Sequence, residues 1–382
     1  MLPIRELKIC KVSNILSRSI ITMQKLWIFS IACIFFFIPA ALAAQGKSVV
    51  MGVNVFDEGF ISQTAQDAEV SQLAESGVKT IRTGLGANSI YFITQAFQRG
   101  IGSIVIVYPF YGSKAKSKGT WSQVPLSEVK PQEFEEWFKP MLDKLEAAGV
   151  RLTAIELGNE INTSGFNGDI PKPGTGRVLG ISDLNNPKDP EGPAIAAGYR
   201  TYVRIMAVAK DIRDHSQYNK ATPILSAGMA DWGLPSAKSW NNQVGVSIPD
   251  AIEFLHQNGM DSLADGYAVH VYPSSDPHTP VSARTTQLEQ NIFAGCKGGA
   301  KACWLTEWGI SSPGQSCPIN DDARTQVITD ERKAFVQFVS QGRVAAFIYF
   351  PWSGLPGQKV DPNAIFRCGA LSKSGKLALN PM

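Results

Sequence analysis

The stretch Ala154-Ile-Glu-Leu-Gly-Asn-Glu-Ile-Asn162 is an apolar run that ends in a small residue, an amide and a carboxylate. A short apolar run closed by glycine is typical of a buried β-strand followed by a turn. A second run, Cys303-Trp-Leu-Thr-Glu-Trp-Gly309, has the same character and carries Glu307, 147 positions after Glu160. If one fold brings the ends of these two strands together, their carboxylates can form a chemical site.

Length and composition allow a large folded domain. The chain has 382 residues, of which 44% are hydrophobic and 18% charged. It can bury a sizeable core as one large barrel or as two ordinary domains. The net charge of +3 depends on the first 44 residues, which hold five basic side chains and one acidic one. The remainder has 31 Lys and Arg against 32 Asp and Glu, so its charge does not indicate a nucleic-acid partner.

The N-terminal segment has the pattern of an export signal. A nearly continuous apolar run, Leu26–Leu42, follows Lys25 and leads into alanines at a small-x-small cleavage pattern. A retained membrane anchor is the alternative, although the run is just short of the roughly 20 residues that a span needs. We predict an upstream extension over residues 1–22, a signal peptide over 23–44 and the mature protein over 45–382. We expect an exported, periplasmic or extracellular monomer that is free of the membrane after cleavage.

Four cysteines remain after the signal: Cys296, Cys303, Cys317 and Cys368. An even number of cysteines fits disulfides in an exported protein. Of the three possible pairings we favour Cys296–Cys303, for its short loop, together with Cys317–Cys368, for the expected closeness of the last two βα loops. Metal binding is the weaker alternative, because the chain has no Cys-x-x-Cys motif and only four histidines. We expect no metal and no cofactor.

Strand-like runs alternate with amphipathic helical runs along the mature chain. The strand-like runs are residues 49–55, 78–83, 101–108, 151–157, 223–227, 266–272, 303–306 and 344–350. The helical runs are residues 63–76, 89–98, 131–148, 194–215, 250–258, 281–293 and 323–341. Eight βα units without a flexible linker predict an α/β protein with one (β/α)8 TIM barrel. A doubly wound open sheet is the alternative, but the first strand lacks a glycine-rich phosphate turn.

In a (β/α)8 barrel the active site lies at the carboxyl ends of the strands. All eight predicted ends carry polar or aromatic residues, which are Asn54 and Phe56, Arg82, Tyr108 and Tyr111, Asn159 and Glu160, Asp231 and Trp232, His270 and Tyr272, Glu307 and Trp308, and Trp352. Hydrolysis of a glycosidic bond needs one carboxyl group to protonate the leaving oxygen and another to attack or to activate water. Aromatic faces hold sugar rings, and amides bind hydroxyl groups.

Two motifs carry a resemblance to a known family. Gly158-Asn159-Glu160 on the fourth predicted strand and Thr306-Glu307-Trp308-Gly309 on the seventh resemble clan A of the glycoside hydrolases, which are retaining (β/α)8 enzymes. The resemblance covers essentially the whole chain after the signal. It implies Glu160 as the general acid/base, Glu307 as the nucleophile and Asn159 as a partner of the sugar 2-hydroxyl. Ile161 stands where many members have proline, which leaves the choice among families 5, 39, 53 and 79 open.

The same resemblance implies supporting roles for further residues at the strand ends. They are Arg82, His270 and Tyr272 near the nucleophile and Trp352 beneath the sugar; we add Trp308, Trp232 and Asn54 as candidate substrate contacts. Strand alternation favours Trp352 as the platform, because it shares a face with Ile348 and Phe350. Simpler interpretations stay open. Arg82 could pair with Glu156, which strand alternation places on the same face as Glu160, and His270 and the tryptophans could belong to the core.

The sequence thus predicts a retaining glycoside hydrolase that cleaves a poly- or oligosaccharide by double displacement. Long loops over residues 111–130 and 162–191 favour a groove for several sugar units and endo cleavage. Donors from Arg82 and Tyr272 would keep the nucleophile ionised. A catalytically inactive carbohydrate-binding barrel and a transglycosylase are the alternatives. A metal-dependent hydrolase would be expected to have His-x-His on the first strand, where this chain has Asn54 and Phe56.

Overall fold

The computed structural model describes residues 49–55, 59, 61–231, 242–296, 301–312, 317–354 and 361–382. The predicted signal peptide and upstream extension lie outside the described residues, as do Phe56 and Trp232. Within these ranges no helix combines the length and the apolar character needed to cross a membrane.

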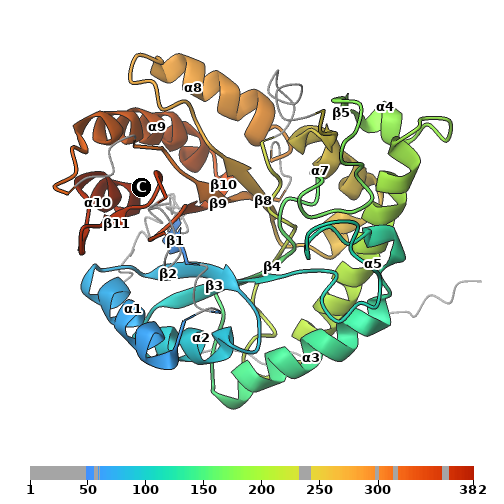
Figure 1. Ribbon diagram of the computed structural model, residues 1–382, viewed down its shortest axis with the longest axis horizontal. Helices are drawn as coiled ribbons and strands as arrows, with labels where there is room; N and C mark the ends of the chain where they lie inside the picture. Colours follow the sequence, from blue (N-terminus) through green and yellow to red (C-terminus); the bar gives the residue numbers. More distant parts are fainter. Residues whose placement is uncertain are drawn as a thin grey trace, which may run out of the picture. The chain divides into compact units, whose positions relative to one another are not determined.

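Eight parallel strands form a nearly closed barrel (Figure 1). They are β1 (Val50–Asn54), β2 (Thr80–Gly84), β3 (Gly102–Val107), β4 (Ala154–Leu157), β6 (Ile224–Leu225), β8 (Tyr267–Val271), β9 (Cys303–Trp308) and β10 (Val344–Tyr349). Their order in the sheet is β6-β4-β3-β2-β1-β10-β9-β8. Single bridges from Leu225 to Gly266 and from Met229 to Val269 join the two edges of this order. The predicted (β/α)8 fold is confirmed.

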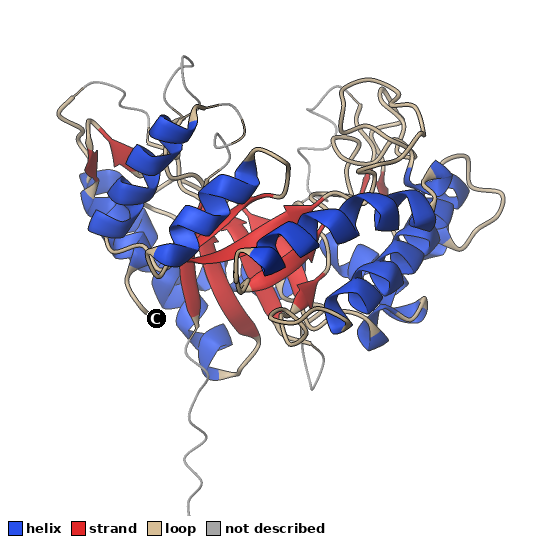
Figure 2. Cartoon of the chain, turned by 90° about the horizontal axis from the view of Figure 1, so that it is seen from below, coloured by secondary structure: helices blue, strands red, loops and turns tan. Residues whose placement is uncertain are grey.

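Helices follow the strands along the chain and lie outside the barrel (Figures 1 and 2). They are α1 (Gln63–Glu75), α2 (Ser89–Gln98), α3 (Pro131–Ala147), α4 (Ile181–Leu184), α5 (Gly192–Asp214), α7 (Ile248–Gln257), α8 (Val281–Gln287), α9 (Asp322–Ser340) and α10 (Lys373–Leu379). Short helical turns occur at η1 (Leu126–Glu128) and η2 (Met260–Ser262), and the π-helical turn η3 (Leu288–Ile292) continues α8. Every predicted helix is present, whereas α4 and α10 were not predicted.

The core has two layers, as expected for strands that are buried on both faces. Inside the barrel one cluster takes a residue from most strands: Ile104, Ala154, Leu225, Ala268, Trp304, Ala346 and Ile348. A larger cluster fills the space between strands and helices. The indole of Trp304 fits inside because Gly266 has no side chain, since a Cβ there would lie 2.7 Å from the ring. The barrel interior is therefore a packed core, and a ligand site must lie at its mouth.

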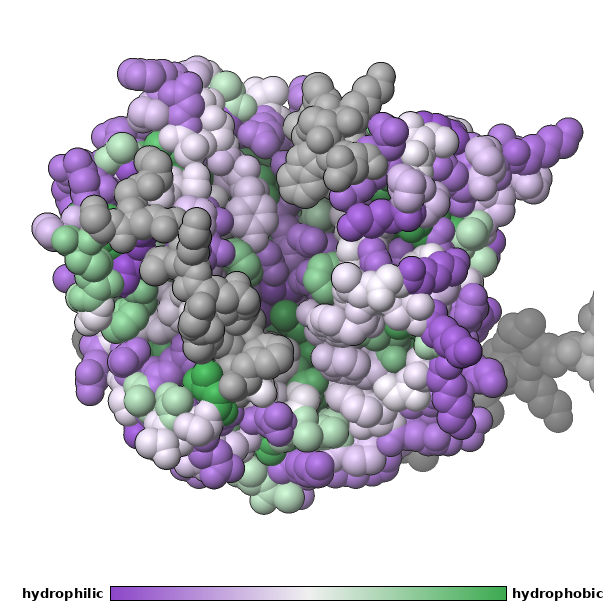
Figure 3. Space-filling model, viewed as in Figure 1, coloured by the Kyte–Doolittle hydropathy of each residue, from purple (hydrophilic) through white to green (hydrophobic). Residues whose placement is uncertain are grey.

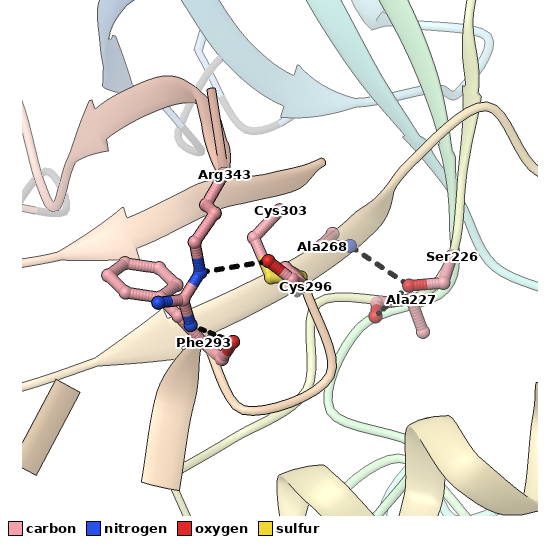
Figure 4. The surroundings of a disulfide bond; sticks show 7 residues. All are labelled: Ser226, Ala227, Ala268, Phe293, Cys296, Cys303 and Arg343. Carbon is pink, nitrogen blue, oxygen red and sulfur yellow. Dashed lines mark hydrogen bonds between the residues drawn. A yellow bond between two sulfur atoms is a disulfide. The ribbon is translucent and has the colours of Figure 1, made fainter. Parts of the chain in front are cut away.

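Both predicted disulfides are present. Cys296 pairs with Cys303 at a Cα–Cα distance of 5.7 Å, and Cys317 pairs with Cys368 at 5.9 Å. The first closes a short loop that leads into β9, where Arg343 also donates to the carbonyls of Cys296 and Phe293 (Figure 4). The second joins the segment after β9 to the turn between β11 (Phe366–Arg367) and β12 (Ala370–Leu371). A further small pair, β5 (Val178–Leu179) with β7 (Gly245–Val246), ties the loops after β4 and β6 together.

Candidate active site

The turn after β4 places Glu160 at the barrel mouth. Gly158 has a φ of 94°, a conformation that glycine adopts without strain, and its N–H donates to the carbonyl of Val107. Glu160 has a φ of 43°, which is uncommon for a residue with a side chain. Its N–H donates to the carbonyl of Gly228 at 2.6 Å and so ties the turn to the segment after β6. Backbone outliers of this kind persist where the surroundings hold them, and they cluster at functional sites.

An irregularity in β9 brings the successive side chains of Thr306 and Glu307 to the same buried polar cluster. Regular alternation would send Thr306 and Glu307 to opposite faces of the strand. Opposite β8, however, Val269 pairs with Leu305 and His270 pairs with Glu307, which leaves Thr306 as an extra residue. Such a bulge re-aims the side chains around it. The Thr306 hydroxyl consequently donates to Glu156 at 3.1 Å, while Glu307 also faces this buried polar cluster.

The two carboxylates meet across the barrel mouth with His270 between them. One oxygen of Glu160, one oxygen of Glu307 and one nitrogen of His270 all lie within 4.8 Å of one another. His270 Nδ1 is 3.1 Å from Glu160 Oε1 and 3.6 Å from Glu307 Oε2. The His270 side chain is fully buried, whereas 26% of the Glu160 side chain is exposed. The fold therefore brings together two carboxylates that lie 147 residues apart in the chain.

Arg82 holds the polar cluster together. Its Nε and Nη2 donate to the two oxygens of Glu156 at 2.6 and 2.8 Å, a pairing that the sequence left open as an alternative. Its Nη1 donates to Glu307 Oε1 at 2.6 Å and to Asn54 Oδ1 at 2.8 Å. Its Nη2 also donates to Asn159 Oδ1 at 2.8 Å. A guanidinium has five N–H groups, so none is left for a ligand. Arg82 acts on the site through its neighbours.

Glu156 is a third carboxylate in this cluster and is completely buried. Besides the guanidinium, it accepts hydrogen bonds from the N–H of Gly228 at 3.0 Å and from the hydroxyl of Thr306. A Cβ at position 228 would lie 2.7 Å from Glu156 Oε1 and 2.0 Å from His270 Nε2. Gly228 therefore leaves the space that both side chains occupy.

Glu307 is held in its ionised form. Burial raises its pKa, but the charges of His270 and Arg82, with hydrogen bonds from Tyr272 and Arg82, outweigh burial, so the pKa of Glu307 is lowered. The Tyr272 hydroxyl donates to Glu307 Oε2 at 2.6 Å. Burial of that hydroxyl, with the charge of Glu307, raises the pKa of Tyr272 well above its ordinary value, so the hydroxyl keeps its proton. Each oxygen of Glu307 thus has its own donor.

A cavity of about 350 Å³ opens above these groups. Its walls come from most of the strand ends: Asn54, Val55, Arg82, Ile106, Tyr108, Asn159, Glu160, Phe166, Tyr272, Glu307 and Phe350. On the face seen in Figure 1, the space-filling view is hollowed near the centre, with hydrophilic side chains in the hollow (Figure 3). Among the described residues the amide nitrogen of Asn159 has no hydrogen-bond partner, since only its oxygen is used, by Arg82. It is a donor available to a ligand.

Six of the predicted site residues line this cavity, namely Asn54, Arg82, Asn159, Glu160, Tyr272 and Glu307, and His270 contacts both catalytic candidates. Trp308 and Trp352 do not line it, because both are fully buried. Trp308 packs edge-on against Phe335 and Tyr349, and Trp352 stacks on Phe366 at 4.6 Å. The prediction that these tryptophans contact sugar is corrected accordingly. The prediction from strand alternation fails at Trp352, because β10 ends at Tyr349 and Trp352 lies beyond the regular strand.

Two phenylalanines that were not predicted as contacts line the cavity instead. Phe350 lies edge-on to Tyr272, with ring centroids 5.9 Å apart, where a sugar platform was expected from Trp352. Its inward direction was visible in the alternation of the last strand. Phe166 reaches the cavity from the loop after β4, and no periodic pattern in that loop could have identified it.

The group Glu160, His270 and Glu307 also resembles a set of metal ligands in type and spacing. The guanidinium of Arg82, however, lies 2.6 Å from Glu307 and 3.5 Å from His270. A buried cation at such distances opposes a second positive charge. Both oxygens of Glu307 also already accept hydrogen bonds from Arg82 and Tyr272. The charge distribution favours a site for an organic substrate.

Comparison by sequence finds no matching family model and no matching curated protein. Among solved structures, the virulence factor SghA from Agrobacterium tumefaciens is similar at a TM-score of 0.52 and 11% identity, over 87% of this chain and 96% of that chain. An endo-1,4-β-D-mannanase from Thermotoga petrophila gives a TM-score of 0.51 at 13% identity, over 86% and 98%. A family 1 β-glucosidase from Thermotoga maritima gives 0.50 at 12% identity, over 86% and 96%. The chain therefore has the (β/α)8-barrel fold that these proteins share.

Proposed function

We propose that the protein is a retaining glycoside hydrolase acting on an oligo- or polysaccharide. The observation that carries this proposal is the placement of Glu160 and Glu307 at the cavity. One carboxylate oxygen of Glu160 lies within 4.8 Å of one carboxylate oxygen of Glu307. Retaining glycosidases hold their two carboxyl groups about 5–5.5 Å apart, and inverting ones about 6.5–9.5 Å apart to admit a water. The short separation favours attack by a carboxylate itself. The shared fold of a β-glucosidase and a mannanase supports the same conclusion.

The environments of the two carboxylates divide their roles. Glu307, with its lowered pKa and two donors, attacks the anomeric carbon while the bond to the leaving oxygen breaks. Glu160, which is partly exposed, gives its proton to that leaving oxygen. In the second half of the reaction, the Glu160 carboxylate takes a proton from a water molecule. The water oxygen attacks the anomeric carbon, and the bond from that carbon to Glu307 breaks. Asn159 is placed to donate its amide N–H to a hydroxyl of the bound sugar.

Arg82, His270 and Asn54 act by positioning rather than by contact with the sugar. All five N–H groups of Arg82 are used by protein acceptors. The side-chain amide of Asn54 donates to the carbonyls of Thr306 and Tyr349 and accepts from Arg82, so it joins β1 to β9 and β10. Tyr272 and Phe350 supply aromatic surface to the cavity. We propose them as the apolar contacts of the sugar ring.

Kinetics of two variants on aryl β-glycosides tests the function. Glu307→Gln should abolish turnover while preserving the fold. Glu160→Ala should lose about 10²–10⁴-fold on substrates with poor leaving groups. Added azide should restore turnover of activated substrates by Glu160→Ala and give the glycosyl azide with retained configuration. Glu75→Gln, which changes an exposed carboxylate at the end of α1, is the matched control and should behave like the parent.

Two results would overturn the proposed roles. One is full residual turnover by Glu307→Gln, and the other is a first-formed product of inverted configuration by NMR. Sugar binding without turnover by the parent would instead indicate a carbohydrate-binding barrel. A product that contains a new glycosidic bond would indicate a transglycosylase.

Export is part of the proposal. The two disulfides fit an oxidising compartment, which agrees with the predicted signal peptide over residues 23–44. Mass spectrometry of the exported protein should find an N-terminus at residue 45. A mature protein that begins upstream of residue 23 would contradict the predicted start site and cleavage.

A further inference from the structure

A second cavity of about 300 Å³ adjoins the candidate active site. Ile106 and Tyr108 line both cavities, so the two share a wall at the end of β3. The rest of the second cavity comes from Gly59 after β1, from the segment over residues 84–89 and from Tyr111 and Trp121 after β3. Cavities that hold small ligands usually measure about 300–1,000 Å³, so each of the two is large enough for a small ligand.

Aromatic rings run from the first cavity into the second. Phe166 of the first cavity stacks on Tyr108, with ring centroids 5.8 Å apart and planes 12° apart. Tyr108 in turn contacts Trp121 edge-on, with ring centroids 5.2 Å apart, and Phe110 also contacts Trp121, with centroids 5.9 Å apart. Trp121 nevertheless leaves 61% of its surface exposed. A single exposed tryptophan is ordinary, but this one is fixed by two rings and forms the wall of a cavity beside a candidate active site.

The loop after β2 leaves room opposite this aromatic wall. It contains Gly84, Gly86 and Ala87, which project little or no side chain. A Cβ at Gly86 would meet no atom within 4 Å. The hydroxyl of Ser89 donates to the Gly86 carbonyl and accepts from the Gly86 N–H, which fixes the course of this loop. A flat ring can therefore enter between the small-residue loop and Trp121.

The described lining of both cavities selects against acidic sugars. Its charged members are Arg82, Glu160 and Glu307. All five N–H groups of Arg82 already have protein acceptors, so among these residues no cation is available to a carboxylate or sulfate group of a ligand. The two glutamates would repel such a group. An uncharged sugar chain, with apolar ring faces and many hydroxyls, matches this lining.

We propose that the second cavity is a further sugar subsite, and that the substrate is an uncharged glycan chain with one unit in the first cavity and a neighbouring unit stacked on Trp121. The inference rests on the proposed glycosidase function of the first cavity. It makes Trp121 a residue that determines preference for chain length, without contact with the reacting atoms.

Kinetics along a chain-length series tests the subsite. The substrates are cello- and manno-oligosaccharides of increasing length, together with aryl β-monoglycosides. For the parent, kcat/KM should rise once a chain fills both cavities. Trp121→Ala should lower kcat/KM on the longer chains about tenfold, which corresponds to about 1.4 kcal/mol. Activity on the monoglycosides should not change. Trp121→Phe, which keeps an aromatic ring, should retain most of the rise in kcat/KM with chain length.

Gly86→Phe is the complementary variant, because it fills the second cavity from the loop after β2 and leaves Trp121 and the catalytic candidates themselves unchanged. It should likewise remove the rise in kcat/KM on chains that are long enough to fill both cavities. Circular dichroism and thermal unfolding check that the variant folds. Should it fail to fold, the exposed Trp121 variants still decide the proposal, since truncating an exposed side chain does not disturb the core.

Binding without catalysis separates this proposal from the proposed function. Glu307→Gln protein should be retarded in native gels that contain glucomannan, laminarin or xylan, and addition of Trp121→Ala should remove the retardation. Polygalacturonate should retard neither protein. If the parent hydrolyses no glycoside but shows this Trp121-dependent retardation, the hydrolase function fails and the subsite stands.

Three results would overturn the subsite. The first is a chain-length preference that is unchanged in both Trp121→Ala and Gly86→Phe. The second is retardation by none of the three neutral polysaccharides. The third is Trp121-dependent retardation by polygalacturonate, which would contradict the uncharged substrate.

Discussion

The ionisation of Glu307 depends in part on its two hydrogen-bond donors. Tyr272 donates to Oε2 and Arg82 to Oε1, and both hydrogen bonds lower the pKa of Glu307 against the effect of burial. A hydrogen bond to a charged group contributes about 1.5–3 kcal/mol of stabilisation, which is more than a hydrogen bond between neutral groups contributes. The loss of either donor should therefore have a measurable effect. The two donors can be tested separately.

Tyr272→Phe removes the donor from Oε2. Because that donor favours the ionised carboxylate, its loss raises the pKa of Glu307, and the acid limb of the pH profile of kcat/KM should move to higher pH. At the optimum, kcat/KM should fall about 10–100-fold, given that one pKa unit corresponds to 1.36 kcal/mol. Tyr91→Phe, which removes a tyrosine hydroxyl that donates to Asp67 and lines neither cavity, is the control. An unmoved acid limb in Tyr272→Phe would contradict the role of Tyr272.

Glu156→Gln should move the acid limb the opposite way. Glu156 and Glu307 share the charge of Arg82, so neutralising Glu156 leaves more of that charge acting on Glu307 and lowers its pKa further. Formation of the glycosyl ester would then remove the remaining negative charge on Glu307. The buried guanidinium would be left without a counter-ion, which is unfavourable in a buried site. We expect a lower kcat together with an acid limb at lower pH, measured on an aryl glycoside, and an acid limb at higher pH would refute this account.

At the scale of elements, strand ends and the segments between them position the site. The bulge in β9 turns both Thr306 and Glu307 toward the cluster, and the turn after β4 holds Glu160 in a left-handed conformation. The segment after β6 contributes Gly228, which bridges to Asn159 and passes close to two buried side chains. These are irregular parts of otherwise regular strands, as is common where a strand must re-aim a side chain.

Gly228→Ala tests the packing of that segment. The added methyl would lie 2.0 Å from His270 Nε2 and 2.7 Å from Glu156 Oε1, and both side chains are buried and hydrogen-bonded. Overpacking of this kind typically costs about 1–3 kcal/mol. Thermal unfolding should show a lower Tm, and kcat/KM should fall with it. Gly86→Ala, whose added Cβ would meet no atom within 4 Å, should leave the Tm unchanged. A variant at Gly228 with parental Tm and kcat/KM would refute the steric argument.

At the scale of the whole molecule, two disulfides close loops of very different length. Cys296 and Cys303 are 7 residues apart, whereas Cys317 and Cys368 are 51 apart. In the chain-entropy model, disulfide stabilisation grows with the loop closed, to about 2 kcal/mol for the shorter and about 4 kcal/mol for the longer. The shorter loop is also held by Arg343, which donates to the carbonyls of Cys296 and Phe293 (Figure 4).

Paired Cys→Ala variants should therefore rank by loop length. Removing Cys317 and Cys368 should lower Tm more than removing Cys296 and Cys303, as measured by thermal unfolding of the oxidised proteins. The doubly reduced parent should unfold at the lowest temperature. Equal or reversed effects of the two pairs would show that loop entropy does not dominate their contributions.

The fold could be predicted almost completely from local patterns. Each of the eight predicted strands overlaps an observed one, and the disulfides pair as expected. The fifth strand is shorter than predicted, covering only Ile224–Leu225, because the barrel closes there through single bridges. The sequence also offered the Arg82–Glu156 pair as an alternative, since alternation along a regular strand places Glu156 on the same face as Glu160, and the structure contains this pair.

By itself, the sequence determined the barrel and the two strand-end carboxylates, because apolar periodicity and glycine turns act over a few neighbouring residues. The tertiary structure decided which of the candidate side chains reach the cavity and which lie in the core. The β9 bulge places Thr306 beside Glu307, the early end of β10 leaves Trp352 in the core, and the loop after β3 carries Trp121 to the second cavity. These placements depend on where strands end and how distant segments pack, and no local pattern encodes such contacts.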